Sequence, residues 1–236
     1  MSTATRTAFD LDELAGARRL TDWMFDQFRP ALADSVVEVG PGVGTFSARL
    51  LEAGVEELLL VEPDPNFAQL LERRFGSDTR VTVVQEGLPE SLTLAARPGE
   101  FGMALCQNVL EHVDDDAAAL RSITASVHPG GHVALLVPAH PRLFGSLDRA
   151  YDHHRRYTRE RLTALVDQAG LELIDLYSFN LLGVAGWWAK SRLGATQLGT
   201  RSLLAYELLL PLWRPLERRL RLRLGLSLIV HARRPL

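Results

Sequence analysis

The sequence predicts an α/β protein with a doubly wound, Rossmann-like sheet. Short apolar or β-branched segments alternate with segments of helical periodicity, and a glycine-rich turn stands between an early strand and the next helix. Strands that alternate with helices of about ten residues form a parallel sheet covered on both faces. Because 236 residues suit one such domain, we predict a single domain over residues 1–236.

The expected elements follow one another without an internal repeat or a low-complexity linker. A cap helix over residues 9–32 carries apolar residues at helical spacing. We expect a turn at His128-Pro-Gly-Gly131 and a helical insertion over about 183–224, which interrupts the alternation. The expected strands are 35–40, 58–61, 80–84, 102–106, 132–137, 171–179 and 226–232, and the helices between them are 45–53, 65–75, 114–127 and 158–169.

Composition excludes several classes of protein. Hydrophobic residues make up 47% and charged residues 23%, which is globular composition. The net charge of −3 argues against a nucleic-acid binder, and Cys106, as the single cysteine, provides neither a disulfide nor a thiolate zinc site. Acidic residues at positions 10, 12 and 13 argue against a secretion signal, and we find no uncharged apolar run of about 18 residues. We therefore expect a cytoplasmic protein.

The glycine-rich turn is Glu38-Val-Gly40-Pro-Gly42-Val-Gly44. Glycines let the backbone approach a ligand closely, and the next helix offers free N–H groups at its start. A dinucleotide site prefers G-x-G-x-x-G, but here the third glycine comes one position early and Thr45 takes its place. Glu38 disfavours a pyrophosphate nearby and favours a cationic ligand.

A second carboxylate, Glu62, ends the next strand. It can accept both hydroxyl groups of a ribose with its two oxygens. The turn and this acid together favour a nucleoside with a positively charged partner, a description that S-adenosylmethionine fits. The alternative at this stage is a turn whose glycines serve only the backbone.

Four ordered segments resemble the class I S-adenosylmethionine-dependent methyltransferases. They are Val37-Glu-Val-Gly-Pro-Gly-Val-Gly44, Val61-Glu-Pro-Asp64, Leu105-Cys-Gln-Asn-Val-Leu-Glu-His-Val113 and His128-Pro-Gly-Gly131. The resemblance implies a seven-stranded sheet whose last strand, 226–232, runs antiparallel beside the fifth. A narrower likeness to bacterial small-molecule methyltransferases covers nearly the whole chain but names no substrate.

The same resemblance assigns the cofactor site. It implies that Glu62 holds the ribose and that Pro63 and Leu88 flank the adenine. Glu86 stands close to where relatives often carry an adenine-binding aspartate, and Trp23 is expected to cover the cofactor. The full expected cofactor-binding set is Trp23, Glu38, Gly40, Pro41, Gly42, Gly44, Glu62, Pro63, Glu86, Gly87, Leu88, Gln107 and Asn108.

Candidate acceptor-side residues follow the fifth strand. His153 and Tyr157 are the catalytic candidates, and a histidine suits a base near neutral pH. The alternative is a loop ordered by ion pairs between Asp148 and its arginines, and the tryptophans of the 183–224 segment serve equally well as packing. The expected substrate-binding set is His140, Asp148, Arg156, Asn180 and Trp187.

Two further features suggest weaker alternatives. Glu111-His112 offers metal-ligand types, but two adjacent residues make no site alone and no third ligand is evident, so we predict no metal. Residues 203–224 form a leucine- and arginine-rich amphipathic segment, which permits peripheral membrane contact, although Pro211 and Pro215 break its regularity.

We therefore predict an S-adenosylmethionine-dependent methyltransferase acting on a small, aromatic or apolar acceptor. The alternatives are a lipid-linked or quinone-like acceptor at a membrane surface, a non-catalytic S-adenosylmethionine-binding protein, and a nicotinamide dehydrogenase. The glycine spacing and Glu38 disfavour the last.

Overall fold

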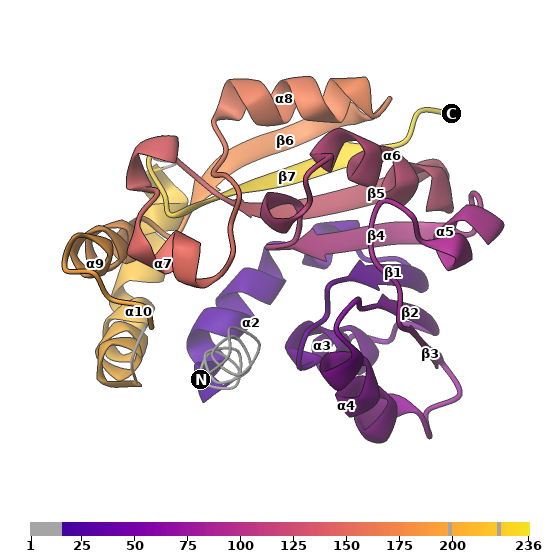
Figure 1. Ribbon diagram of the computed structural model, residues 1–236, viewed down its shortest axis with the longest axis horizontal. Coiled ribbons are helices and arrows are strands. Elements are labelled where there is room, and N and C mark those ends of the chain that lie inside the picture. Colours follow the sequence, from indigo (N-terminus) through magenta and orange to yellow (C-terminus); the bar gives the residue numbers. More distant parts are fainter. Residues whose placement is uncertain (1–15, 198–199, 221–222) are drawn as a thin grey trace.

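One seven-stranded sheet organises the chain, in a computed structural model that describes residues 16–197, 200–220 and 223–236 (Figure 1). Its strand order is β3-β2-β1-β4-β5-β7-β6, and β7 runs antiparallel to both neighbours. The strands are β1 (Ser35–Val39), β2 (Glu57–Val61), β3 (Val81–Val84), β4 (Phe101–Gln107), β5 (Val127–Pro138), β6 (Glu172–Phe179) and β7 (Ser227–Arg233). The predicted doubly wound sheet with an antiparallel last strand is confirmed.

Helices cover both faces of the sheet, and each face has its own apolar core (Figure 1). One face packs against α5 (Leu92–Ala96), α6 (Asp116–Ser126) and α8 (Arg159–Gln168). The other packs against α2 (Arg18–Asp26), α3 (Thr45–Glu52) and α4 (Pro65–Phe75). The central strands are buried on both sides, which explains their continuous apolar runs.

The helical insertion forms two helices at one end of the sheet. They are α9 (Leu181–Arg192) and α10 (Thr200–Leu220), and the short α7 (Ser146–Ala150) packs beside α9 (Figure 1). Helix α10 continues through Pro211 and Pro215, so the expected break there is wrong. No helix in the described part of the chain is long and apolar enough to cross a membrane.

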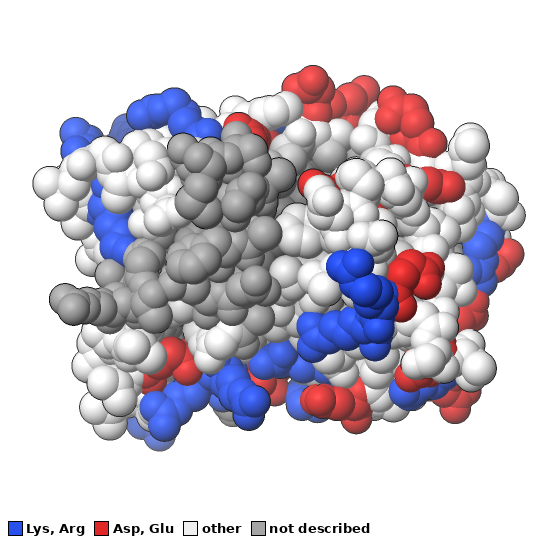
Figure 2. Space-filling view, turned by 60° about the horizontal axis from the view of Figure 1, so that its bottom comes forward, with Lys and Arg blue, Asp and Glu red and all other residues white. Residues whose placement is uncertain are grey.

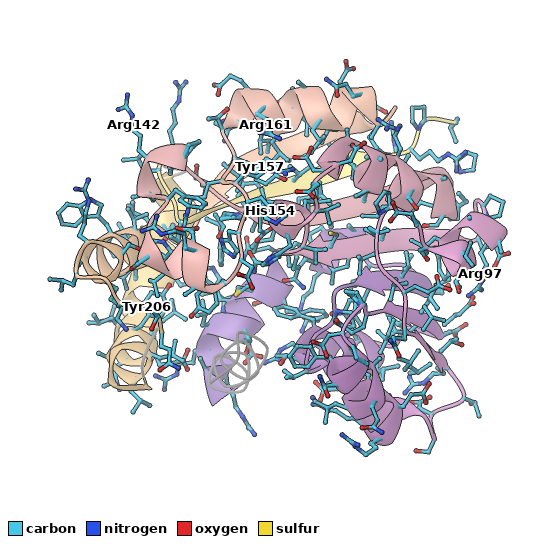
Figure 3. The ribbon with its side chains drawn as sticks, viewed as in Figure 1. Arg97, Arg142, His154, Tyr157, Arg161 and Tyr206 are labelled. Atoms are coloured by element: carbon cyan, nitrogen blue, oxygen red, sulfur yellow. The ribbon has the colours of Figure 1, made fainter. Side chains whose placement is uncertain are left out.

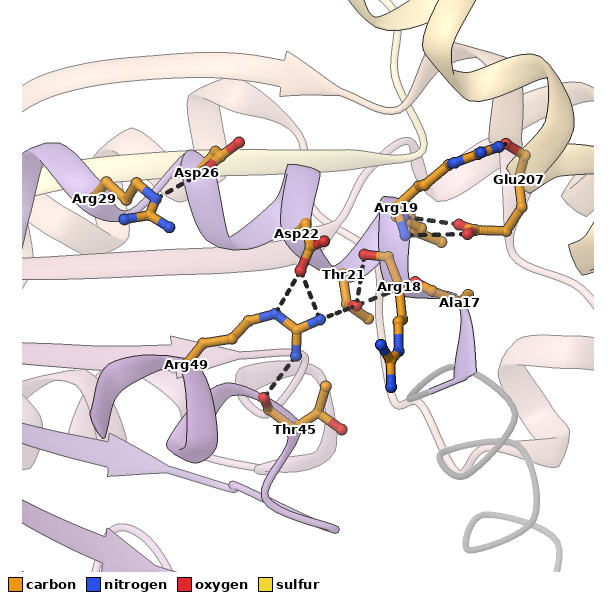
Figure 4. Close-up of polar contacts among 11 residues, drawn as sticks. Ala17, Arg18, Arg19, Thr21, Asp22, Asp26, Arg29, Thr45, Arg49 and Glu207 are labelled. Atoms are coloured by element: carbon orange, nitrogen blue, oxygen red, sulfur yellow. Dashed lines mark hydrogen bonds and ion pairs between the residues drawn. The ribbon is translucent and has the colours of Figure 1, made fainter. Parts of the chain in front are cut away.

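Helix α10 also fixes α2 in place (Figure 4). The Glu207 carboxylate accepts hydrogen bonds from the backbone N–H groups of Arg19 and Leu20, at 3.0 and 2.8 Å. Helix α2 has no side-chain cap from its own sequence, so this distant acid satisfies its first turn. On its other side, Arg49 of α3 donates to Asp22 and Thr21.

The structure corrects one predicted element, the turn at 128–131, and does not describe the start of another, the cap helix over 9–32. Residues 128–131 belong to β5 rather than to a turn, and the pairing of β4 with β5 shifts there from Phe101↔Val127 to Met103↔His132. The predicted turn is therefore wrong, and the segment forms an irregular part of the strand instead. Residues 9–15 of the predicted cap helix lie outside the described residues.

Figure 2 shows one face of the molecule, on which basic and acidic side chains alternate along the lower edge while acidic side chains gather at the upper right. Short 3-10 helices complete the fold at Arg29–Ala31, Leu110–His112 and Pro141–Leu143. The second of these comes shortly after β4, and its His112 lines the cavity at the end of that strand.

Candidate functional site

A cavity of about 960 Å³ opens where β1, β2, β4 and β5 end. Parallel strands place their carboxyl ends at one edge of the sheet, which is where doubly wound folds bind ligands. Many predicted site residues meet in its wall: Glu38, Gly40, Pro41, Gly42, Glu62, Pro63, Glu86, Gly87, Leu88, Gln107, Asn108, His153, Arg156, Asn180 and Trp187. Segments distant in sequence therefore share one cavity.

The carboxylate of Glu62, the residue after β2, orders the glycine turn by accepting hydrogen bonds from its backbone. Glu62 accepts hydrogen bonds from the backbone N–H groups of Gly42 and Asp64, at 2.9 and 3.0 Å, one on each oxygen. Gly40 adopts φ +67°, and a Cβ there would collide with Val109. Each Glu62 oxygen keeps a further lone pair, so the carboxylate can order the turn and still accept from a ligand.

Glu38 is a buried acid beneath this turn. Its carboxylate is 3% exposed and accepts a 2.6 Å hydrogen bond from the Ser47 hydroxyl. Burial raises its pKa to about 7, against the lowering effect of that hydrogen bond, and nearby Glu62 raises it further. A cationic ligand would favour the ionised form, so Glu38 suits an ammonium or sulfonium partner.

The end of β4 provides an unpaired acceptor. The Gln107 side-chain oxygen is buried and has no hydrogen-bond partner among the described residues. Asn108, next to it, adopts φ +50°, which is uncommon for a residue with a side chain. An orphaned buried oxygen beside a strained residue is typical of a site that a ligand completes.

Three cofactor predictions are changed by the structure. Trp23 packs against Phe179, with ring centroids 4.3 Å apart, and does not line the cavity; Leu20, Thr21 and Met24 of α2 do so instead. Leu20 and Met24 are four residues apart and therefore lie on the same face of α2, and this spacing could have identified the face that lines the cavity.

The other two changed predictions concern Gly44 and Glu86, which make structural contacts that the family resemblance did not predict. Gly44 begins α3 at φ +78°, where a Cβ would meet Phe75 and Leu71, so it serves close helix packing and lies outside the cavity wall. The Glu86 carboxylate accepts from Ser91 and from Thr93 at the start of α5. Oε2 thus has both lone pairs occupied, and only Oε1 keeps one for a ligand.

Asp148 is a buried carboxylate that accepts hydrogen bonds from residues on the acceptor side of the cavity. It is fully buried and does not line the cavity, contrary to its predicted contact with substrate. One oxygen accepts from His153 Nδ1 at 2.9 Å and from Arg156 Nε at 2.6 Å, and the other accepts from Gly145 N and from Trp187 Nε1. Burial raises its pKa, but these donors outweigh that effect, so its pKa lies below the ordinary value.

This carboxylate therefore orients three cavity residues at once. The Arg156 guanidinium also lies 4.7 Å from the centre of the Trp187 ring, which completes a packed polar cluster. Since a carboxylate only accepts, the His153 Nδ1 atom carries a proton, so in the neutral ring the lone pair lies on Nε2. The predicted ion pairing that orders this loop is confirmed by the Asp148–Arg156 contact, whereas the catalytic role of His153 stays a prediction.

The structure does not support the predicted catalytic role of Tyr157. Its side chain is completely buried against the α6 and α8 side of the sheet, and its hydroxyl donates to Asp116 at 2.9 Å (Figure 3). Burial, then Asp116, raises its pKa. A phenol so placed is absent from the cavity wall, so we withdraw the catalytic assignment.

Of the remaining acceptor-side residues that we predicted, Asn180 lines the cavity and His140 does not. His140 does not line the cavity, although its Nε2 atom is buried without a described partner. Asn180 lines it, but its side-chain oxygen already accepts from Gly183 N and the Tyr206 hydroxyl, so only its NH₂ remains for a ligand. Tyr206 and Lys190 also face the cavity and escaped the sequence analysis, because both lie inside the helical insertion.

The donor set fits S-adenosylmethionine. Two acidic groups, Glu38 and Glu62, flank a glycine turn, and the orphaned Gln107 oxygen lies in the same cavity. Acceptors therefore outnumber fixed positive charges at this end, as a ligand with a ribose, an ammonium and a sulfonium requires.

Comparisons with known proteins agree with this geometry. A family model described as "Methyltransferase domain" matches residues 12–176. A ubiquinone biosynthesis O-methyltransferase from Ralstonia nicotianae is 33% identical over 114 residues, which cover 48% of this chain and 46% of that protein. A protein of the same name from Methylobacterium nodulans is 29% identical over 177 residues, covering 69% and 70% of the two chains.

Among solved structures, an S-adenosylmethionine-dependent methyltransferase from Mesorhizobium loti superimposes with a TM-score of 0.59 at 18% identity. It covers 89% of this chain and 96% of its own. That likeness concerns the fold, whereas the family match covers well over half of the sequence. The chain belongs to the methyltransferase-domain family, as a class I enzyme with S-adenosylmethionine as methyl donor.

Proposed function

We propose that the protein transfers a methyl group from S-adenosylmethionine to a small aromatic or apolar acceptor. One continuous cavity carries the proposal, because it joins the acidic glycine turn to an end lined by Phe179, Leu182, Trp187 and Leu203. Aromatic and aliphatic walls with few polar groups are typical of sites for apolar small molecules. The bound donor supplies an electrophilic methyl group on sulfur.

The chain's own residues then have separate tasks. Glu38 and Glu62 bind the donor, and the apolar wall orients the acceptor and excludes water. Alignment of the reacting groups can contribute about 7–11 kcal/mol. His153 lines the cavity, and Asp148 engages its Nδ1, which leaves Nε2 as the ring nitrogen available to the acceptor. We propose that turnover depends on the lone pair that Nε2 carries in the neutral ring.

Donor binding is tested by thermal shift with S-adenosylhomocysteine and, separately, NADH. At about 100 times its dissociation constant a ligand adds about 2.7 kcal/mol, and each kcal/mol moves the midpoint roughly 2–4 °C for a chain of this size. The rise with S-adenosylhomocysteine should vanish in Glu62→Ala and persist in Glu72→Ala, an exposed acid of α4. A rise with NADH alone would show that the turn was misassigned.

Catalysis is tested by release of S-adenosylhomocysteine with aromatic acceptors. His153→Ala should lower turnover about 10²–10⁴-fold, the contribution typical of a group that helps a reacting hydroxyl lose its proton, without changing the S-adenosylhomocysteine shift. His154→Ala is the matched control, because its ring pairs with the exposed Asp114 instead. Unchanged turnover in His153→Ala would refute its role, and binding without turnover on any acceptor would favour the non-catalytic alternative.

A lipid-linked, quinone-like acceptor is the second candidate. The ubiquinone O-methyltransferase relatives suggest it, and α10 exposes Leu204, Leu208 and Leu212 by 60%, 72% and 80%. Apolar side chains exposed on an amphipathic helix can rest on a membrane surface. A phenol with a prenyl tail should then outperform the same phenol without it, and only in the presence of anionic vesicles.

A further inference from the structure

Three potential metal ligands converge at the acceptor end of the cavity: Glu111, His112 and His153. Each offers one ligand atom, and these atoms all lie within 4.8 Å of one another. The sequence supplied only the adjacent pair. The third residue arrives because the His154 N–H donates to the Glu111 carbonyl at 2.8 Å, which ties its loop to the turn after β4.

The carboxylate of Glu111 lacks the partners that its burial requires. Its side chain is 0% exposed, and neither oxygen has a hydrogen-bond partner among the described residues. The nearest candidate, His153 Nε2, is 4.0 Å from one oxygen, beyond hydrogen-bonding distance. A buried carboxylate without a partner is costly, and a bound cation is one of the few groups that satisfies it.

Both histidines are oriented as metal ligands usually are. His153 Nδ1 donates to the Asp148 carboxylate, and His112 Nδ1 lies 3.3 Å from the Asp152 carbonyl oxygen, which can only accept. Each Nδ1 atom therefore carries a proton, and Nε2 is the nitrogen that the neutral ring offers to a metal. Metal-binding histidines typically donate their other ring N–H to a carboxylate or carbonyl in this way.

The distances and charges suit a small divalent cation. Ligands bound at about 2.1 Å lie roughly 3–4 Å from one another, so side-chain shifts of less than an ångström close the site. Asp148 is already paired with Arg156, so Glu111 is the acid left to bind a cation among the described residues of this cluster. Two imidazoles with one carboxylate favour a first-row transition cation or zinc over magnesium and calcium.

We infer that Glu111, His112 and His153 bind a divalent transition-metal cation that holds the acceptor's hydroxyl oxygen. The inference rests on the proposed methyl transfer and deepens it. A cation with three protein ligands keeps open positions, and His112 and His153 both line the cavity. A hydroxyl bound there ionises more readily and releases its proton to water, so the lone pair of His153 serves as a ligand rather than as the proton acceptor.

The test is direct binding of Co²⁺ and Zn²⁺ to the metal-free protein. Calorimetry should give one site, and bound Co²⁺ should show the visible absorption of a low-coordinate ion. Glu111→Gln and His153→Ala should each weaken binding at least tenfold, and Asp148→Asn, which removes the orienting acceptor, about 10–100-fold. His154→Ala should bind as the wild type does, within twofold.

S-adenosylhomocysteine shifts, measured on every variant, verify folding and separate the two proposals. A normal shift with no stoichiometric metal site, or with metal binding equal in Glu111→Gln, would overturn the cation site and leave the methyltransferase assignment intact. Metal binding without any shift would instead contradict the proposed transfer. If a chelator leaves turnover unchanged while His153→Ala abolishes it, the cation role is refuted and His153 acts directly on the acceptor.

Discussion

Glu38→Gln tests whether the acid beneath the glycine turn is held near its titration point. The folded pKa of about 7, against an ordinary 4.5, means that the folded protein keeps a proton that the unfolded chain loses between these values. The free energy of unfolding therefore falls as pH rises through that window. At about 1.4 kcal/mol per pH unit, the loss is about 3 kcal/mol above pH 7 and absent below pH 4.5.

The glutamine variant keeps an acceptor for the Ser47 hydroxyl but cannot ionise. Urea denaturation of the ligand-free protein between pH 5 and 8 should show the wild type losing about 2–3 kcal/mol of stability relative to the variant, and the midpoint of thermal unfolding should fall with it by roughly 4–12 °C for a chain of this size. Other groups titrate in both proteins, so the difference between them isolates Glu38. Parallel curves would refute the buried-acid reasoning.

Donor affinity provides the complementary measurement. Binding a ligand with an ammonium group favours ionised Glu38, so S-adenosylhomocysteine should bind more tightly as pH rises to about 7 and then level off. Methylthioadenosine lacks the amino-acid end and should show no such rise. Glu38→Gln should remove the slope for S-adenosylhomocysteine and leave methylthioadenosine unaffected; equal slopes for both ligands would place the cation elsewhere.

Three further substitutions test how the cavity is supported, each measured by urea denaturation together with the S-adenosylhomocysteine shift. Gly44→Ala should lose more stability than Gly170→Ala, since both have positive φ but only Gly44 lies against other side chains; equal losses would contradict the packing argument. Tyr157→Phe should lose about 1.5–3 kcal/mol with the donor shift retained, because it removes a buried bond to Asp116; a lost shift would return Tyr157 to the site. Glu207→Ala should lose about 1 kcal/mol and weaken donor binding by loosening α2, and an unchanged protein would show that α2 needs no cap from α10.

The sequence by itself determined the layered fold and predicted the donor half of the site. Strand, turn and helix are contiguous there, so Gly40, Gly42 and Glu62 can be recognised from local pattern and from the ends of neighbouring strands. These residues lie at the cavity as expected. Local pattern predicted the last strand, whereas its antiparallel direction and its place beside β5 came from the family resemblance, and both are confirmed.

Only the tertiary structure decided which side chains face the acceptor. Arg156 lines the cavity while its neighbour Tyr157 lies in the core, because an extended segment sends adjacent side chains to opposite sides. The meeting of Glu111 with His153 depends on how a long loop closes over the turn after β4, which leaves no periodic trace in the sequence. A shift of one residue in phase moves a side chain from cavity to core, so composition and spacing alone leave the acceptor side open.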